Sequence, residues 1–136
     1  MNGRRAAIVF ALAITSAACT PLRPPGCAAG QQYAVQDTLY FGTAKPNGSV
    51  SAEEWKRFLE ETVTPRFPQG LTTAQAAGQW RGADGATVRE ATHVLQLVHP
   101  GGAAQDSAVA DIAAAYKSKF EQEAVLRVRS PVCITF

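Results

Sequence analysis

The sequence lacks any block of like charge. Lys and Arg total 13 and Asp and Glu total 11, and once Arg4 and Arg5 near the start are set aside the two signs balance at 11 each. Nucleic-acid binding depends on a basic face, and electrostatic attraction to anionic lipid depends on a basic patch. We therefore expect neither a nucleic-acid partner nor a strong pull toward anionic lipid.

Residues that ligate metals or carry out catalysis are also scarce. His93 and His99 are the only histidines; six residues apart on one predicted strand, they lie about 20 Å apart and cannot share a metal ion. The sequence contains no nucleophile elbow, no phosphate-binding loop and no paired carboxylate motif. We expect no metal and no cofactor, and a non-catalytic role is favoured over an enzymatic one.

The N-terminus carries an export signal. Residues 1–5 contain two arginines, residues 6–14 are apolar, and small residues then lead into Cys19. The apolar run is too short to cross a bilayer, which needs about 20 residues. A basic start, an apolar run and a small-residue end are typical of a signal peptide. We predict a signal peptide at 1–18, an N-terminal linker at 19–35 and a single domain at 36–136.

Cys19 has two interpretations. It resembles the modified cysteine of bacterial lipoproteins, although Ser16 stands where their signals usually have leucine. Ser16 and Ala18 also fit an ordinary signal-peptidase site. We favour lipidation of Cys19, with the Pro-rich segment 20–26 as a tether. The protein is then exported and either periplasmic or lipid-anchored to the envelope, with the outer membrane favoured where there are two.

Two cysteines remain after Cys19. In an oxidising compartment Cys27 and Cys133 are expected to bond. Two free thiols or a metal-binding pair are the alternatives, but no histidine or third cysteine lies near either one at ligand spacing. We predict a disulfide.

Periodicity predicts two helices and four strands. Ser51 and Glu54 form a capping box at the start of a helix that Pro65 ends. Asp84 and Gly85 join two extended runs as a hairpin. The second helix follows residues 100–102 and has Val109, Ile112, Ala113, Tyr116 and Phe120 on one face. The expected strands are 37–42, 71–81, 87–99 and 124–136.

This order of elements is that of the ferredoxin-like βαββαβ fold. It gives an α+β domain with one four-stranded antiparallel sheet and two helices on one face. Right-handed crossovers place the first and last strands side by side, which would bring Cys27 and Cys133 together. The opposite face of the sheet is then left uncovered.

Strand alternation predicts what that uncovered face presents. In the functional interpretation, this face binds a small ligand or a partner's sheet, including that of a second copy in a homodimer. In the alternative, it is a solvated face on which arginines protect an edge strand from pairing with another chain. The side chains that we expect there are Tyr40, Gln96, Arg127 and Arg129, together with Gln75 and Gln79.

Three further residues have a functional and a structural interpretation. Arg66, in a stiff proline-bracketed segment, either meets a carboxylate or phosphate or ties its loop to a helix C-terminus. Trp80 either lines a pocket or fills the core. His99, at a strand end, is either catalytic or structural. The ligand-binding candidates are Tyr40, Arg66, Gln79, Trp80, Gln96, His99 and Arg127.

Several motifs together resemble a family of small exported bacterial proteins, many of them lipoprotein-like, catalogued as a domain of unknown function. They are Tyr40-Phe41-Gly42, Trp55-x-x-Phe58, Val63-Thr64-Pro65-Arg66-Phe67-Pro68-x-Gly70, Gly78-Gln79-Trp80-Arg81, Arg89-Glu90 and Pro131-Val132-Cys133. The resemblance implies export and one domain, and it supplies no activity, substrate or catalytic residue. We expect a binding module for a small molecule or a protein; the alternative is a cofactor-independent enzyme built as a dimeric α+β barrel.

Overall fold

A computed structural model describes residues 26–136 of the chain. The expected signal peptide, the lipidation expected at Cys19 and the linker as far as residue 25 lie outside the described residues. The first strand begins at Gln32, so it includes the last residues of the segment 19–35 that the sequence assigns to a linker.

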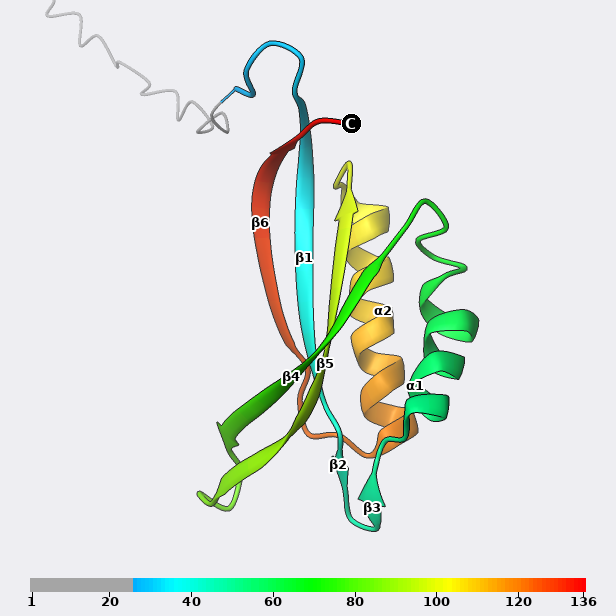
Figure 1. Ribbon diagram of the computed structural model, residues 1–136, viewed down its shortest axis with the longest axis vertical. Coiled ribbons are helices and arrows are strands. Elements are labelled where there is room, and N and C mark those ends of the chain that lie inside the picture. The colour runs from blue at the N-terminus through cyan, green and yellow to red at the C-terminus, as the bar shows by residue number, and fades with distance from the viewer. Residues whose placement is uncertain (1–25) are drawn as a thin grey trace, which may run out of the picture.

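The protein is an α+β structure with one four-stranded antiparallel sheet and two helices, as expected (Figure 1). The strand order is β4-β5-β1-β6, which is consistent with a ferredoxin-like arrangement. A short β2-β3 hairpin follows β1, in addition to the four strands that the sequence predicts. The strands are β1 (Gln32–Gly42), β2 (Ala44–Lys45), β3 (Gly48–Ser49), β4 (Thr72–Arg81), β5 (Thr87–His99) and β6 (Leu126–Ile134).

Helix α1 (Ala52–Phe58) begins at the predicted capping box. The Ser51 hydroxyl accepts from the Glu54 backbone N–H at 3.2 Å, and the Glu54 carboxylate accepts from the Ser51 N–H at 2.8 Å. The hydrogen bond from the Ser51 N–H lowers the pKa of Glu54 to about 2, together with a second hydrogen bond from Lys45 Nζ at 2.9 Å. The helix continues as the π-helical turn η1 (Leu59–Val63), and α2 (Ala103–Phe120) follows β5.

Both helices lie on one side of the sheet, which we call the helix face (Figure 1). Between them and the sheet, Phe41, Trp55, Phe58 and Tyr116 form an aromatic cluster, with the Phe41 and Tyr116 ring centroids 4.6 Å apart. Leu39, Leu95, Leu97 and Ile112 are fully buried around it. The core therefore occupies one face of the sheet.

The other face, which we call the open sheet face, carries the even-numbered residues of β1, β4, β5 and β6. The register sets this: Tyr40 is opposite Leu126 and Val94, and opposite residues in an antiparallel pair point to the same side. Among the described residues no helix packs on that face (Figure 1).

The expected placement of both arginines on the open sheet face is wrong. Arg127 is opposite Leu39 and Arg129 is opposite Asp37, so both lie on the helix face. Strand β6 is an edge strand, and its inward positions lie beside the buried carboxylate of Asp37 rather than over apolar core. Its apolar side chains face outward instead.

The other four side chains expected on the open sheet face are divided between the two faces. Gln75 and Gln79, opposite His93 and Arg89, are also on the helix face. Tyr40 and Gln96 are on the open sheet face, as expected.

The predicted disulfide is present between Cys27 and Cys133. Their Cα atoms are 5.6 Å apart, and 106 positions separate them in the sequence. Cys27 precedes β1, Cys133 lies in β6, and these two strands pair from Gln32–Ile134 to Tyr40–Leu126. The bond thus closes most of the domain into one covalent loop.

Candidate functional site

The open sheet face is exposed, yet many of the side chains on it are apolar. Five large apolar side chains on it remain between 38% and 60% exposed. Exposed apolar surface gathered on one face is typical of an interaction site rather than of a solvated sheet. The five are Tyr40, Trp80, Val98, Leu126 and Val128.

A cavity of about 230 Å³ opens on this face between β4, β5 and β1 and the loop after α2. We call it the Trp80 hollow. Its walls are mostly apolar, and of the described residues that line it none is basic. The lining residues are Tyr40, Gly42, Gly78, Gln79, Trp80, Glu90, Thr92, Gln122, Ala124 and Leu126.

One carboxylate, that of Glu90, is held inside the Trp80 hollow. Its Oε1 accepts from Trp80 Nε1 at 2.9 Å, and its Oε2 accepts from the backbone N–H of Ala44 at 2.6 Å. The carboxylate lies over Gly42, where a Cβ would come within 2.5 Å of Oε1. Glycine at that position is therefore needed for the carboxylate to reach both donors.

A second hollow, of about 560 Å³, lies toward the other end of the sheet. It is lined by residues that include Gln96, Val98, His99 and the chain terminus at Phe136. Two of the candidate residues, Gln96 and His99, therefore lie there, away from Tyr40 and Trp80.

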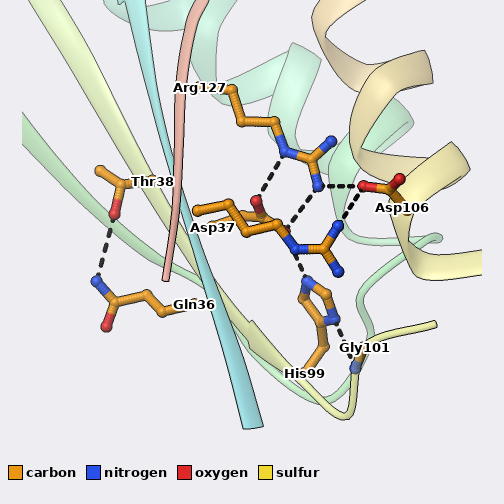
Figure 2. A network of polar contacts seen from close by, with 8 residues as sticks. Gln36, Asp37, Thr38, His99, Gly101, Asp106 and Arg127 are labelled. Atoms are coloured by element: carbon orange, nitrogen blue, oxygen red, sulfur yellow. Dashed lines mark hydrogen bonds and ion pairs between the residues drawn. The ribbon is translucent and has the colours of Figure 1, made fainter. Parts of the chain in front are cut away.

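Arg127 belongs to a polar network on the helix face that centres on Asp37 (Figure 2). Asp37 is fully buried, and Arg127 donates to both its oxygens, from Nε at 2.7 Å and from Nη2 at 3.0 Å. Asp106, in the first turn of α2, accepts from Arg127 at 2.6 Å and from Arg129 at 2.7 Å. Burial opposes ionisation of Asp37, but the bonds and charges of Arg127 and His99 outweigh it and lower its pKa below 3.8.

His99 completes the network from β5. Its Nε2 lies 2.8 Å from the Asp37 carboxylate, and its Nδ1 accepts from the backbone N–H of Gly101 at 3.1 Å (Figure 2). Because Nδ1 is an acceptor, the ring proton is on Nε2 and is donated to Asp37. Both ring nitrogens are thus engaged inside the fold, where a catalytic histidine would need one directed at substrate.

The remaining candidates are engaged by neighbouring groups. Arg66 is exposed and donates to the Thr62 carbonyl at 2.6 Å, which is the loop-to-helix contact of its structural interpretation. Gln79 accepts from Arg89 at 2.9 Å across the hairpin. The structure therefore brings Tyr40 and Trp80 together at the Trp80 hollow. Gln79 also lines it, although its side chain is bonded to Arg89 and its strand position belongs to the helix face, whereas Arg66 and Arg127 lie elsewhere.

Sequence reasoning missed Glu90 and Asp37 as site residues. Asp37 is in phase with Leu39 and Phe41, which marks it as a core-facing carboxylate that needs partners, so a signal for it was there. Glu90 carries no such signal. Its position depends on Gly42, 48 positions earlier in the chain, and only the β1–β5 pairing brings them together.

His93 is expected to make stability depend on pH. It is buried and stacked on Trp55, with ring centroids 4.5 Å apart, and its Nε2 has no hydrogen-bond partner within residues 26–136. Burial lowers its pKa below 6.5, so the unfolded chain takes up the proton first as the pH falls. Stability should be complete above pH 6.5 and decrease below it, measured by urea unfolding at pH 7.5 and 5.5.

The variant His93→Phe tests this cause. Phenylalanine keeps a flat ring against Trp55 and removes the titrating group, so its urea midpoint should change less between the two pH values than that of the wild type. An equal decrease in both proteins would assign the pH dependence to other groups.

Within residues 26–136, no group of three His, Cys, Asp or Glu side chains could hold a metal ion. No helix in the same region is long and apolar enough to cross a membrane.

Comparison with known proteins gives a family and a fold. The family model described as "Protein of unknown function (DUF3574)" matches residues 36–136. No curated protein matches the chain. A phage SAM lyase in complex with S-methyl-5′-thioadenosine is similar in structure, with a TM-score of 0.57 at 13% identity over 84% of this chain and 96% of that one. The phage SAM lyase in its apo state has a TM-score of 0.50 at 14% identity, covering 82% and 95%.

Proposed function

Because the chain belongs to the DUF3574 family of proteins of unknown function, its role has to be inferred from its own side chains, and we propose that it is an exported protein that binds a small molecule on the open sheet face. The Trp80 hollow is the observation that carries this proposal. It combines exposed aromatic walls with a few fixed polar groups, which is the usual composition of a ligand site.

Export is supported from two ends of the chain. Residues 1–18 have the composition of a signal peptide, and the Cys27–Cys133 bond suits an oxidising compartment. In this proposal Cys19 is lipidated and anchors the domain to the outer membrane. The intact mass of protein recovered from the cell envelope tests it, since an acylated Cys19 adds a mass that a secreted chain lacks.

The position of the hollow agrees with an anchor at the N-terminus. The chain enters β1 at Gln32, and Tyr40, at the hollow, is eight residues further along. At about 3.3 Å per residue the two points are about 26 Å apart. A domain tethered through its N-terminus would therefore hold the Trp80 hollow away from the membrane. The strand order supports classing this domain as ferredoxin-like.

Binding can be tested with benzyl alcohol as a neutral aromatic probe. The chain has 2 tryptophans, and Trp55 is buried in the core, so the Trp80 indole N–H is a separate NMR signal at the hollow. We expect a saturable shift of this signal during titration. Ala124→Phe should fill the hollow from an exposed loop and abolish the shift, whereas Val98→Ala, outside the hollow, should preserve it. A wild-type signal that does not move would refute the proposal.

An enzymatic role is the second candidate, favoured by the likeness to phage SAM lyase. In this version two copies pack their open sheet faces together and enclose the hollow between them. The face suits self-association because, among the strand residues that the structure describes, Glu90 is the one charged side chain on it, so two copies would bring little like charge together. Incubation with SAM should then release S-methyl-5′-thioadenosine, and sedimentation should give the mass of two chains. If the protein sediments as a single chain and releases no product from SAM, the enzymatic candidate fails and the binding role remains.

A further inference from the structure

We propose that the Trp80 hollow binds an organic cation, such as a quaternary ammonium group, with Glu90 as its counter-charge. The inference rests on the proposed function and adds the chemical class of the ligand. It follows from three properties of the hollow: a fixed carboxylate, no basic neighbour in the lining, and aromatic walls.

The carboxylate of Glu90 is held before any ligand arrives. Trp80 and Ala44 each donate one hydrogen bond to it, one to each oxygen, and Gly42 leaves the space that it occupies. Each carboxylate oxygen can accept more than one hydrogen bond or contact. A group fixed in this way loses little conformational entropy on binding, which favours affinity.

The charge of Glu90 is not paired with a cation from the described part of the chain. Among residues 26–136, none of the ion pairs includes Glu90, and no lysine, arginine or histidine lines the hollow. The other polar side chains in the lining are neutral amides, hydroxyls and the indole. The hollow therefore repels anions and attracts a positive ligand.

The aromatic walls select the kind of cation. Trp80 and Tyr40 are each 38% exposed, and both line the hollow. Because the Trp80 N–H is already bonded to Glu90, its ring offers an apolar and π-rich surface. A strongly hydrated metal ion gains little from such walls, whereas an alkylated cation with a diffuse charge gains cation–π and apolar contacts. A cavity of about 230 Å³ suits a head group of that kind rather than a large ligand.

Choline and its neutral analogue 3,3-dimethylbutanol separate charge from shape. They differ in having a quaternary nitrogen or a quaternary carbon, and both can be titrated against the full-length protein while the Trp80 indole signal is followed. We expect choline to bind roughly tenfold more tightly than the neutral analogue, and the difference to shrink at high salt.

The variant Glu90→Gln removes the charge with little change of shape. We expect it to weaken choline binding by about tenfold and to leave 3,3-dimethylbutanol binding unchanged. Asp111→Asn, on an exposed position of α2, is the matched control and should change neither.

Each outcome has one meaning. If both probes bind wild-type protein equally, the hollow is a ligand site without cation preference, and only this inference fails. If Glu90→Gln leaves choline binding intact, the counter-charge assignment fails. If benzyl alcohol moves the Trp80 signal but neither of these probes does, only this inference fails; if none of the three moves it, the proposed function fails as well. The wild-type comparison needs no variant, so it decides the matter even if Glu90→Gln folds poorly.

Discussion

Replacing Asp37 with alanine is expected to lower the free energy of unfolding by about 3 kcal/mol. Breaking a buried ion pair by removing one member costs about 3–5 kcal/mol, because the remaining charge loses its partner. Asp37 is fully buried and accepts two hydrogen bonds from Arg127 and one from His99. We expect the lower end of this range because the Arg127 side chain is a quarter exposed to water and retains its ion pair with Asp106. Urea unfolding at pH 7 measures the change.

Asp106→Asn is the control for this prediction. Asp106 contacts the same Arg127 guanidinium, but its side chain is 48% exposed, so water replaces much of what is lost. Its effect should be about 1 kcal/mol or less. Equal effects of the two substitutions would mean that the network acts as a surface ion pair and that burial of Asp37 contributes little.

Acid unfolding gives an independent check on Asp37. Its pKa in the folded protein lies below 3.8, so its contribution is complete above pH 3.8 and is lost as the pH falls through the folded pKa. Asp37→Ala should therefore lack the part of the acid-induced loss of stability that wild type shows below pH 3.8. The His93 effect lies at higher pH and should be the same in both proteins.

The fold could be predicted because the local signals agreed with one another. The capping box at Ser51, the turn at Asp84 and the alternation of residues 87–99 each have a short-range cause, and the structure has α1, the hairpin and β5 at those places. The number of cysteines and the oxidising compartment predict the disulfide independently of the strand order. Its agreement with the pairing of β1 and β6 confirms that the first and last strands are neighbours.

The site was harder to predict because alternation does not say which face is inward. Residues 126–129 alternate apolar and basic, and the usual assumption buries the apolar set. Here Arg127 points inward because Asp37 neutralises it there, and Leu126 remains 60% exposed at the Trp80 hollow. The residue that reverses the assignment is 90 positions away from Arg127 in the sequence. Short-range periodicity cannot contain that information.

Removing the disulfide with the double variant Cys27→Ser/Cys133→Ser is expected to lower the free energy of unfolding by about 4–5 kcal/mol. The bond closes a loop spanning 106 positions, and a loop of about 100 residues restricts the unfolded chain by about 4.7 kcal/mol in the chain-entropy model. The loss should be seen as a lower urea midpoint at equal protein concentration.

The chain-entropy model also predicts how the folded state of this variant should behave. If the bond acts through the unfolded chain, the folded protein should be nearly unchanged, because β1 and β6 keep nine paired positions without it. The tryptophan bands of the near-ultraviolet circular dichroism, to which the buried Trp55 contributes, should then match those of the wild type in the absence of urea, because the band of the disulfide itself lies at shorter wavelengths. A changed spectrum would show that the sulfur bridge holds the β1–β6 edge in place. A loss below about 1 kcal/mol with an unchanged spectrum would show that the unfolded chain already keeps its two ends close together.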